Sequence, residues 1–418
     1  MKSMFRRGVA AGMLAALTVS IGLHAQEFRL FDRNVQVHGF GSQGFVYTND
    51  NNWLSMNTSA GSFAMTDGAV NASSQITDRF RVGAQLYDRN VGHMGKWHPE
   101  LDWAYGDYKF SSWLGIRGGK VKTALGLYND TQDLNFLHTW AILPQSIYSM
   151  DLRSSTMAHT GGDIYGHVKL SKKLGELSYT TYAGQRSQDP YGGYVLGLEA
   201  IGLAMKNYGG WMQGEDLRWK TPLPGLLAGA SLMNQHITGN GVYNQALVVD
   251  PFLAGLSLPN GALESEHSLK NDFYQYYFDY TRKGLRVDGE YRREWRLESI
   301  AYNSPAGALL AAFVVPLDQR SSYASAAYRV SKRLELGTYF SWYFTNWSSD
   351  HSLPADHVYD KDVTARFDVD SHWNVKIEGH FINGYGRFDS VRGFYEQFNP
   401  GGLQPTTNGV VVKTAFNF

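Results

Sequence analysis

The sequence predicts an all-β protein, a closed antiparallel barrel of about sixteen strands that spans a membrane. Segments of strict two-residue alternation recur along the chain, very short connections alternate with long ones, and the first residues have the features of an export signal. The composition agrees: aromatic residues make up 14% of the 418 residues, and the mean hydropathy of −0.33 is too low for a bundle of apolar transmembrane helices.

The segment 1–25 is expected to be a signal peptide. Three bases (Lys2, Arg6 and Arg7) precede an apolar stretch, and small residues precede an expected cleavage after Ala25. A membrane anchor is the alternative, but the stretch is short and no later segment has 18 consecutive apolar residues. We therefore expect 26–418 to be a single exported domain.

Charge and cysteine content exclude several classes of protein. The chain has no cysteine, which excludes disulfides, thiolate zinc sites and cysteine nucleophiles. The signal segment holds three bases and no acid, so 35 basic and 38 acidic residues remain beyond it. This near balance gives no indication of a nucleic-acid partner.

The segment LRVDGEYRREWRLE, 285–298, shows the alternation most clearly. Leu285, Val287, Tyr291 and Trp295 fall in one phase, which Arg293 interrupts. The other phase is ionic and carries both signs. A strand with one apolar and one ionic face fits a barrel wall between lipid, or a neighbouring subunit, and a water-filled lumen. The residues expected to line the lumen are Arg286, Asp288, Glu290, Arg292, Glu294 and Arg296.

Similar segments predict sixteen strands. Connections within pairs are a few residues long, as at 77–79 and 281–284, whereas connections between pairs are long and polar. This alternation is typical of outer-membrane barrels, which have short periplasmic turns and long external loops. The predicted strands are 34–48, 68–77, 79–90, 99–110, 112–122, 162–170, 174–185, 208–220, 225–237, 270–281, 284–298, 320–331, 334–346, 360–370, 373–384 and 408–418.

A secreted β-sandwich or β-helix is the soluble alternative. It predicts connections of similar length at both strand ends and a buried face of aliphatic residues. Here the apolar face carries aromatic residues near strand ends, which suits girdles at the two membrane interfaces. Those aromatic residues are Trp103, Tyr274, Tyr291, Trp295, Trp342 and Phe344. The final strand, GVVVKTAFNF, has Phe416 and Phe418 in one phase and resembles the signal read by the outer-membrane barrel assembly machinery.

The chain resembles the sixteen-stranded porins of Gram-negative bacteria. The resemblance covers the architecture of 28–418; it is most specific in WLGIRGGKVKTALGLYNDTQD, 113–133, and weaker in GFGSQGFVYTNDNNW, 39–53. It implies an integral outer-membrane protein, surrounded by lipid and lipopolysaccharide and assembled as a homotrimer. It also implies passive diffusion of small hydrophilic solutes, and a third external loop that folds into the lumen.

That third connection, 123–161, is expected to narrow the pore. Its segment 135–150 is too apolar and aromatic for a free surface loop. Its acids Asp130, Asp133 and Asp151 would oppose strand bases, and together they would create a transverse field that orients polar solutes. The expected pore-lining bases are Arg81, Lys120, Lys122, Arg286, Arg292, Arg296 and Arg366. Arg117 is out of phase with Lys120 and Lys122, and a bulge at Gly118–Gly119 would reconcile them.

Other functions have weaker support in the sequence. The pairs His93/His98 and His351/His357 lack a third placed ligand, so no metal or cofactor is expected. No nucleophile motif indicates an enzyme. The apolar loop 245–259 is a candidate for a trimer latch or a receptor surface. A channel selective for small carboxylates or sugars remains the main alternative to a general pore.

Overall fold

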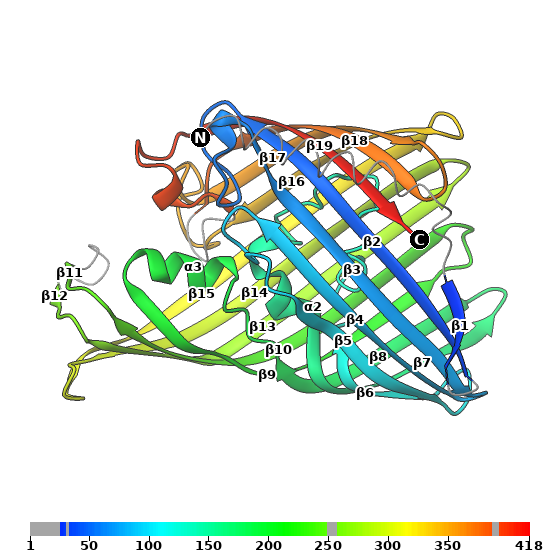
Figure 1. Ribbon diagram of the computed structural model, residues 1–418, viewed down its shortest axis with the longest axis horizontal. Coiled ribbons are helices and arrows are strands. Elements are labelled where there is room, and N and C mark those ends of the chain that lie inside the picture. The colour runs from blue at the N-terminus through cyan, green and yellow to red at the C-terminus, as the bar shows by residue number, and fades with distance from the viewer. Residues whose placement is uncertain (1–25, 31–32, 249–256, 387–392) are drawn as a thin grey trace.

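The computed structural model describes residues 26–30, 33–248, 257–386 and 393–418 (Figure 1). The predicted signal peptide lies outside these residues. Sixteen antiparallel strands form a closed barrel, as predicted, and pairing between the last strand and β2 completes the ring. The strands are β2 (Arg33–Thr48), β3 (Ser62–Thr77), β4 (Phe80–Val91), β5 (Glu100–Lys109), β6 (Gly115–Lys122), β7 (Ala158–Ser171), β8 (Gly175–Arg186), β9 (Leu203–Lys220), β10 (Leu226–Tyr243), β13 (Leu263–Arg282), β14 (Leu285–Asn303), β15 (Leu309–Arg329), β16 (Leu334–Phe344), β17 (His357–Asp368), β18 (Trp373–Asn383) and β19 (Thr406–Asn417).

The remaining elements are short. A strand β1 (Gln26–Leu30) pairs with the start of β2, and β11 (Leu247–Val248) pairs with β12 (Ser257–Leu258). The helical segments are η1 (Thr58–Ala60), η2 (Met150–Leu152), α2 (Arg153–Met157), α3 (Gly193–Ala200) and η5 (Glu396–Phe398). Among the described residues, no helix is both long and apolar enough to span a membrane.

Several strands are longer at their external ends than the sequence indicated. β10 and β13 have 18 and 20 residues, so much of the loop expected at 238–269 is paired strand. Figure 1 shows these two strands extending to the left together with β14 and β15. In the apolar loop 245–259, Leu258 is buried against Leu203 and Tyr243, whereas 249–256 lie outside the described residues.

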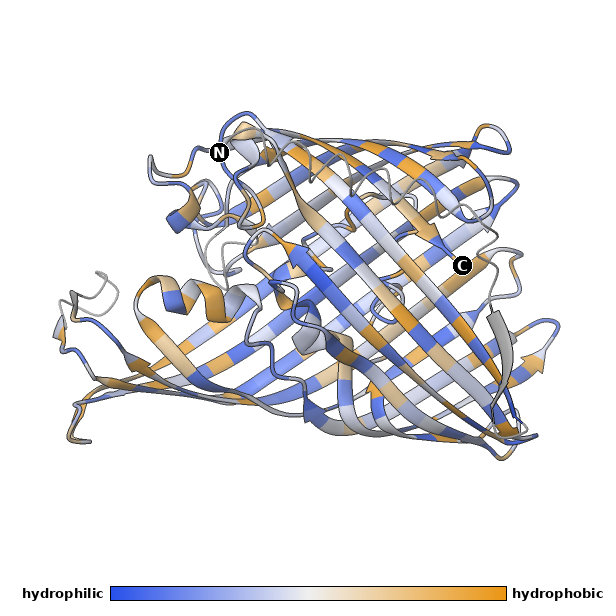
Figure 2. Cartoon of the chain, viewed as in Figure 1, coloured by the Kyte–Doolittle hydropathy of each residue, from blue (hydrophilic) through white to orange (hydrophobic). Residues whose placement is uncertain are grey.

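The two faces of β14 differ in burial in the phase that the alternation indicated. Asp288, Glu290 and Arg292 are buried inside the barrel, whereas Leu285 is exposed on the outer face. Figure 2 shows the same alternation as hydrophilic and hydrophobic bands along the barrel strands. The side chain at every second position therefore faces outward, and the intervening ones face the interior.

Arg293, the exception in this pattern, is paired on the outer face. Its guanidinium donates two hydrogen bonds to Asp318, from Nε at 2.8 Å and from Nη2 at 3.0 Å. Arg320 also bonds Asp318, at 2.9 Å, and the Arg293 guanidinium lies 5.5 Å from the Trp295 ring. A charge exposed to lipid would be costly, and this local pairing together with the aromatic ring compensates for it.

Two expectations about β5 and β6 were wrong. The pairing of β4 with β5 shifts register after Gln85, so Trp103 lies opposite Gln85 and lines an interior cavity instead of facing lipid. The expected bulge at Gly118–Gly119 is not present, because the pairing with β7 runs without a shift from Gly115 to Lys122. Arg117 faces inward, where it forms a bidentate ion pair with Asp163 at 2.6 and 2.9 Å.

The loss of stability caused by a charge on the barrel's outer face should depend on the depth of that charge in the membrane. Val363 is 54% exposed midway along β17, and Val330 is 52% exposed beside a short turn. We expect Val363→Arg to reduce the free energy of unfolding by about 2–4 kcal/mol and Val330→Arg by about 0–1 kcal/mol. Urea unfolding in lipid vesicles measures both values; equal losses would contradict this orientation of the wall.

Candidate pore constriction

The connection between β6 and β7, residues 123–157, is called loop 3 here and lies inside the barrel. Its backbone and side chains bond inward-facing residues on strands from both halves of the wall. A loop of this length carries many backbone polar groups that must find partners away from bulk water. The lumen charges supply those partners, so the ionic faces of the strands hold loop 3 in place.

Glu290 on β14 is one anchor of loop 3. Its carboxylate, 3% exposed, accepts hydrogen bonds from the backbone N–H of Leu127 at 3.1 Å and from the hydroxyl of Tyr148. Tyr323 Oη donates a further bond at 2.9 Å, and Gln275 Nε2 another. Four donors therefore converge on this buried carboxylate, two of them from loop 3.

The opposite wall supplies cationic anchors. Lys376 on β18 is fully buried and donates to the carbonyl oxygens of Asn135 and Trp140, the latter at 2.8 Å. Arg366 on β17 donates to the carbonyl oxygen of His138 at 2.9 Å. Bonds from charged donors are stronger than neutral ones, so this wall fixes the path of 135–140.

A third set of contacts surrounds Asp133. Its carboxylate lies 3.0 Å from Lys122 Nζ and 3.8 Å from Arg153 Nη2, and it accepts a bond from Gln85 at 2.8 Å. Burial alone would raise the pKa of Asp133, but Lys122 and Arg153 lower it below its usual range. Arg153 also pairs with Asp102 at 3.1 Å, which links α2 to β5.

Apolar side chains cover loop 3 from the external side. Ile142 packs in a buried cluster with Trp53, Leu54, Met94 and Phe394, which come from three other connections of the barrel. Trp140 packs edge-on against Tyr339 of the wall, with ring centroids 5.2 Å apart. These contacts remove apolar surface from water and reinforce the polar anchors.

The interior is filled unevenly. Beside β4 to β9 a cavity of about 540 Å³ remains, with Arg117, Lys122, Asp130, Asp216 and Arg218 in its lining. The aromatic side chains of Trp103 and Tyr105 also line this cavity. On the other side of loop 3, the space beside Arg292, Glu294 and Arg296 is about 40 Å³. The charged open space therefore lies on one side of the loop.

The acids expected at the constriction fall in three different places. Asp130 lines the cavity, and Asp133 is enclosed by its bases. Asp151 lies elsewhere, since its carboxylate accepts bonds from Ser149 and, at 3.1 Å, from Tyr395 of the last external loop. The structure therefore brings one of the three expected acids to the open space.

The expected pore-lining bases are also divided. Lys122 lines the cavity, whereas Arg286 pairs with Asp279 at 2.7 Å and with Asp288 at 3.3 Å. Arg292 donates to the carbonyl oxygen of Ile147 at 2.8 Å. Further along the strand, Arg296 lies 3.6 Å from Glu294. These arginines therefore pair with the acidic residues and the loop 3 backbone that fill this half of the lumen.

Two expected bases lie apart from these groups. Arg81 is exposed near a short turn and donates to Ser73 at 2.9 Å. Lys120 pairs across the sheet with Ala104 and Thr160, on the face opposite Arg117, and its Nζ donates to the carbonyl oxygen of Leu101 at 2.6 Å. Without the expected bulge, Lys120 remains on the outer face.

Sequence reasoning missed several charges of the site. Asp216 and Arg218 alternate with the outward-facing Leu217 and Trp219, so the two-residue period would have placed them in the lumen. Arg153 follows the expected constriction segment 135–150 and gave no periodic signal. Lys376 was in the lumen phase, but its bonds to loop 3 depend on where that loop runs.

Solved structures show what this architecture resembles. OmpF of Salmonella typhi, in a complex with daunomycin, aligns over 94% of this chain and 100% of its own with TM-score 0.55 and 11% identity. OmpT, an outer-membrane protein of Vibrio cholerae, aligns over 94% and 100% with TM-score 0.52 and 9% identity. An anion-selective porin from Comamonas acidovorans aligns over 92% and 100% with TM-score 0.50 and 11% identity.

The chain has the barrel fold of the porins. No protein-family model and no curated protein matches the sequence. At these identities the structural likeness establishes the porin fold. It does not identify the solute or the subfamily, so any inference about the solute comes from the residues of the lumen.

Removing the Glu290 anchor should loosen loop 3. We expect Glu290→Ala to lower the free energy of unfolding by more than about 3 kcal/mol, because four buried donors lose their acceptor. Urea unfolding in vesicles measures the loss. Glu176→Ala is the control, since Glu176 has only a 4.0 Å ion pair with exposed Lys169, and it should change stability by less than about 0.5 kcal/mol. Similar values for both variants would exclude Glu290 as an anchor.

Proposed function

We propose that the protein is an outer-membrane channel for passive diffusion of small hydrophilic solutes. The observation that carries this proposal is the charged space of about 540 Å³ that loop 3 leaves inside a closed barrel. A barrel of sixteen strands has an interior wide enough for an aqueous passage. The proposed passage runs between loop 3 and the inner faces of β4 to β9, and it involves no catalytic step.

The charges of this space support a selective field. Arg117, Lys122 and Arg218 belong to the wall, whereas Asp130 belongs to loop 3. Opposite charges across a narrow passage orient dipolar solutes and disfavour apolar ones. The transverse field expected from the sequence is therefore proposed for this group of residues, with Asp130 as its acidic side.

Selectivity for small carboxylates is the second candidate. Three bases and two acids, Asp130 and Asp216, line the cavity, and Asp216 bonds Arg218 at 2.8 Å. Arg117 pairs with Asp163 and Arg218 with Asp216, so a solute carboxylate would share these planar guanidinium groups with their protein partners. A preference for sugars would instead depend on Trp103 and Tyr105.

The homotrimer implied by the porin resemblance is supported by a polar patch on the outer wall. Gln213, Glu215, Asn234 and Asp272 form a polar patch on the outer faces of the neighbouring strands β9, β10 and β13. Glu215 is exposed midway between Trp211 and Trp219, where a carboxylate would meet lipid in a monomer. We propose that another copy of the chain covers this patch; one of the solved OmpT structures is described as a trimer form.

Delivery to the outer membrane is part of the same proposal. It involves cleavage of the signal peptide after Ala25 and recognition of Phe416 and Phe418 by the barrel assembly machinery. Phe416 is exposed on the outer face of β19, and Phe418 exchanges backbone hydrogen bonds with Gly39 of β2 at 2.9 and 3.2 Å. The exposed wall would then contact lipid and lipopolysaccharide.

Shortening loop 3 should widen the passage. We expect deletion of 130–150 to raise single-channel conductance several-fold, because this segment fills the lumen beside β14 to β19. Planar-bilayer recordings of the folded barrel measure the change. Unchanged conductance in a barrel that still folds would contradict a constriction formed by loop 3.

Neighbouring lysines on β6 provide a matched test of selectivity. Lys122→Gln removes a cation from the cavity lining, so the reversal potential in a salt gradient should shift toward cation preference. Lys120→Gln removes the same charge from the outer face and should leave the reversal potential unchanged. Equal shifts for both variants would contradict the proposed path beside β4 to β9.

A further inference from the structure

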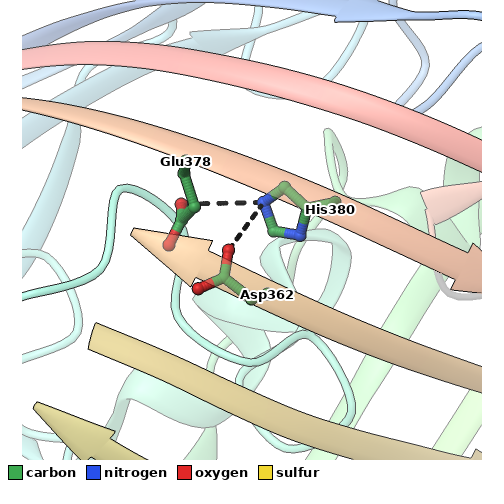
Figure 3. A group of neighbouring side chains, drawn as sticks. All are labelled: Asp362, Glu378 and His380. Atoms are coloured by element: carbon green, nitrogen blue, oxygen red, sulfur yellow. Dashed lines mark ion pairs between the residues drawn. The ribbon is translucent and has the colours of Figure 1, made fainter. Parts of the chain in front are cut away.

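A group of three side chains on β17 and β18 stands apart from the proposed passage. Asp362 and His380 lie directly opposite each other in the pairing of the two strands, and Glu378 precedes His380 by two residues on the same face. Figure 3 shows the three side chains directed toward one another. They are called the Asp–Glu–His cluster here, and one ligand atom from each lies within 4.8 Å of the others.

The cluster is buried and its polar atoms are not satisfied by the protein. Each of the three residues is 1% exposed. In the part of the chain that the structure describes, both carboxylate oxygens of Asp362, Oε1 of Glu378 and Nε2 of His380 have no hydrogen-bond partner. His380 Nε2 is 3.6 Å from Glu378 and 3.9 Å from Asp362, which is too long for a hydrogen bond. Buried polar atoms in this condition are commonly satisfied by an ordered water or a bound ion.

The imidazole is oriented for metal binding. His380 Nδ1 lies 3.0 Å from Asp360 Oδ2, which also accepts a bond from the hydroxyl of Tyr339 at 3.0 Å. The Asp360 carboxylate fixes the proton on Nδ1, so the lone pair on Nε2 points toward Asp362 and Glu378. Metal-binding histidines typically have such a carboxylate behind them, because it sets the tautomer and increases the basicity of the ring.

We propose that the Asp–Glu–His cluster binds one divalent transition-metal ion of the zinc class. Zinc takes imidazole nitrogen and carboxylate oxygen at about 2.0–2.2 Å, so the ligand atoms would approach one another to within about 3–4 Å. Calcium and magnesium prefer six or more oxygen ligands, and a nitrogen ligand disfavours them. Among the described residues, His380 is the only basic group within ion-pair distance of Asp362 and Glu378, so a metal ion bound by the neutral imidazole would supply the compensating charge.

The position of the cluster gives the ion a structural role. The other oxygen of Glu378, Oε2, accepts a hydrogen bond from the backbone N–H of Ile142 in loop 3 at 2.9 Å. The Trp53 ring packs edge-on against His380 at 5.0 Å and covers the site from the first external loop. A bound ion would therefore connect the wall to the segment of loop 3 that lies across the lumen.

Zinc binding by the refolded full chain in detergent tests the proposal. After treatment with EDTA and dialysis, calorimetric titration with Zn²⁺ should give one site per chain, and Zn²⁺ should raise the thermal unfolding temperature. His380→Asn should weaken binding by more than about 100-fold, and Asp360→Asn by about 10–100-fold. His159→Asn is the matched control: His159 is also a fully buried inward-facing histidine, on β7, and its loss should leave zinc affinity unchanged.

Folding is checked separately, by the shift in electrophoretic mobility on heating and by circular dichroism. Binding of Ca²⁺ or Mg²⁺ but not Zn²⁺, absence of saturable zinc binding by the folded wild-type chain, or an equal loss in His159→Asn would each overturn the proposal. The measurement is independent of conductance, so the channel proposal and the metal site can fail separately.

Discussion

The fold depends on the requirement that every backbone N–H and C=O inside a membrane find a partner in the protein. A closed antiparallel barrel meets this requirement without an edge, and the pairing of β19 with β2 completes it. Closure separates the side chains of each strand into an outer and an inner set. The ionic inner faces, the aromatic outer surface and the space for an inserted loop all follow from that separation.

The inserted loop meets the same requirement by a different route. Loop 3 forms no sheet with the wall, so turns within the loop bond some of its backbone groups and side chains bond others. Glu290, Arg292, Arg366 and Lys376 provide these partners, and their own charges are satisfied in return. Charges of both signs in the lumen therefore have a structural role, apart from the selective role proposed for them.

The two-residue period was enough to predict sixteen strands and the inner face of β14, because a register slip would place several charges in lipid. The period assigned the wrong face to residues on β5 and β6, where one residue more or fewer in the pairing decides which face a side chain occupies. The register shift after Gln85 moved Trp103 to the interior, and the absent bulge left Lys120 outside. Arg293 was unexplained because its partner, Asp318, belongs to the next strand.

The candidate site was less predictable than the fold, since it depends on contacts between residues far apart in the chain. The sequence identified Asp130 as an acid of the long loop and Lys122 as an opposing strand base, but Asp216 and Arg218 join them only through the closed sheet. The metal cluster shows the same difficulty. Glu378 and His380 were in the lumen phase, yet Asp362 faces His380 only because β17 and β18 pair in one register.

The uneven filling of the lumen separates two roles of its charges. Beside β14 to β19 the charges are enclosed and hold loop 3, and the Asp–Glu–His cluster belongs to this half. Beside β4 to β9 the charges line open space. Because buried anchors tolerate substitution poorly, the selectivity of the proposed channel would vary mainly through the open half. In that proposal the barrel could change its preferred solute while loop 3 stays fixed.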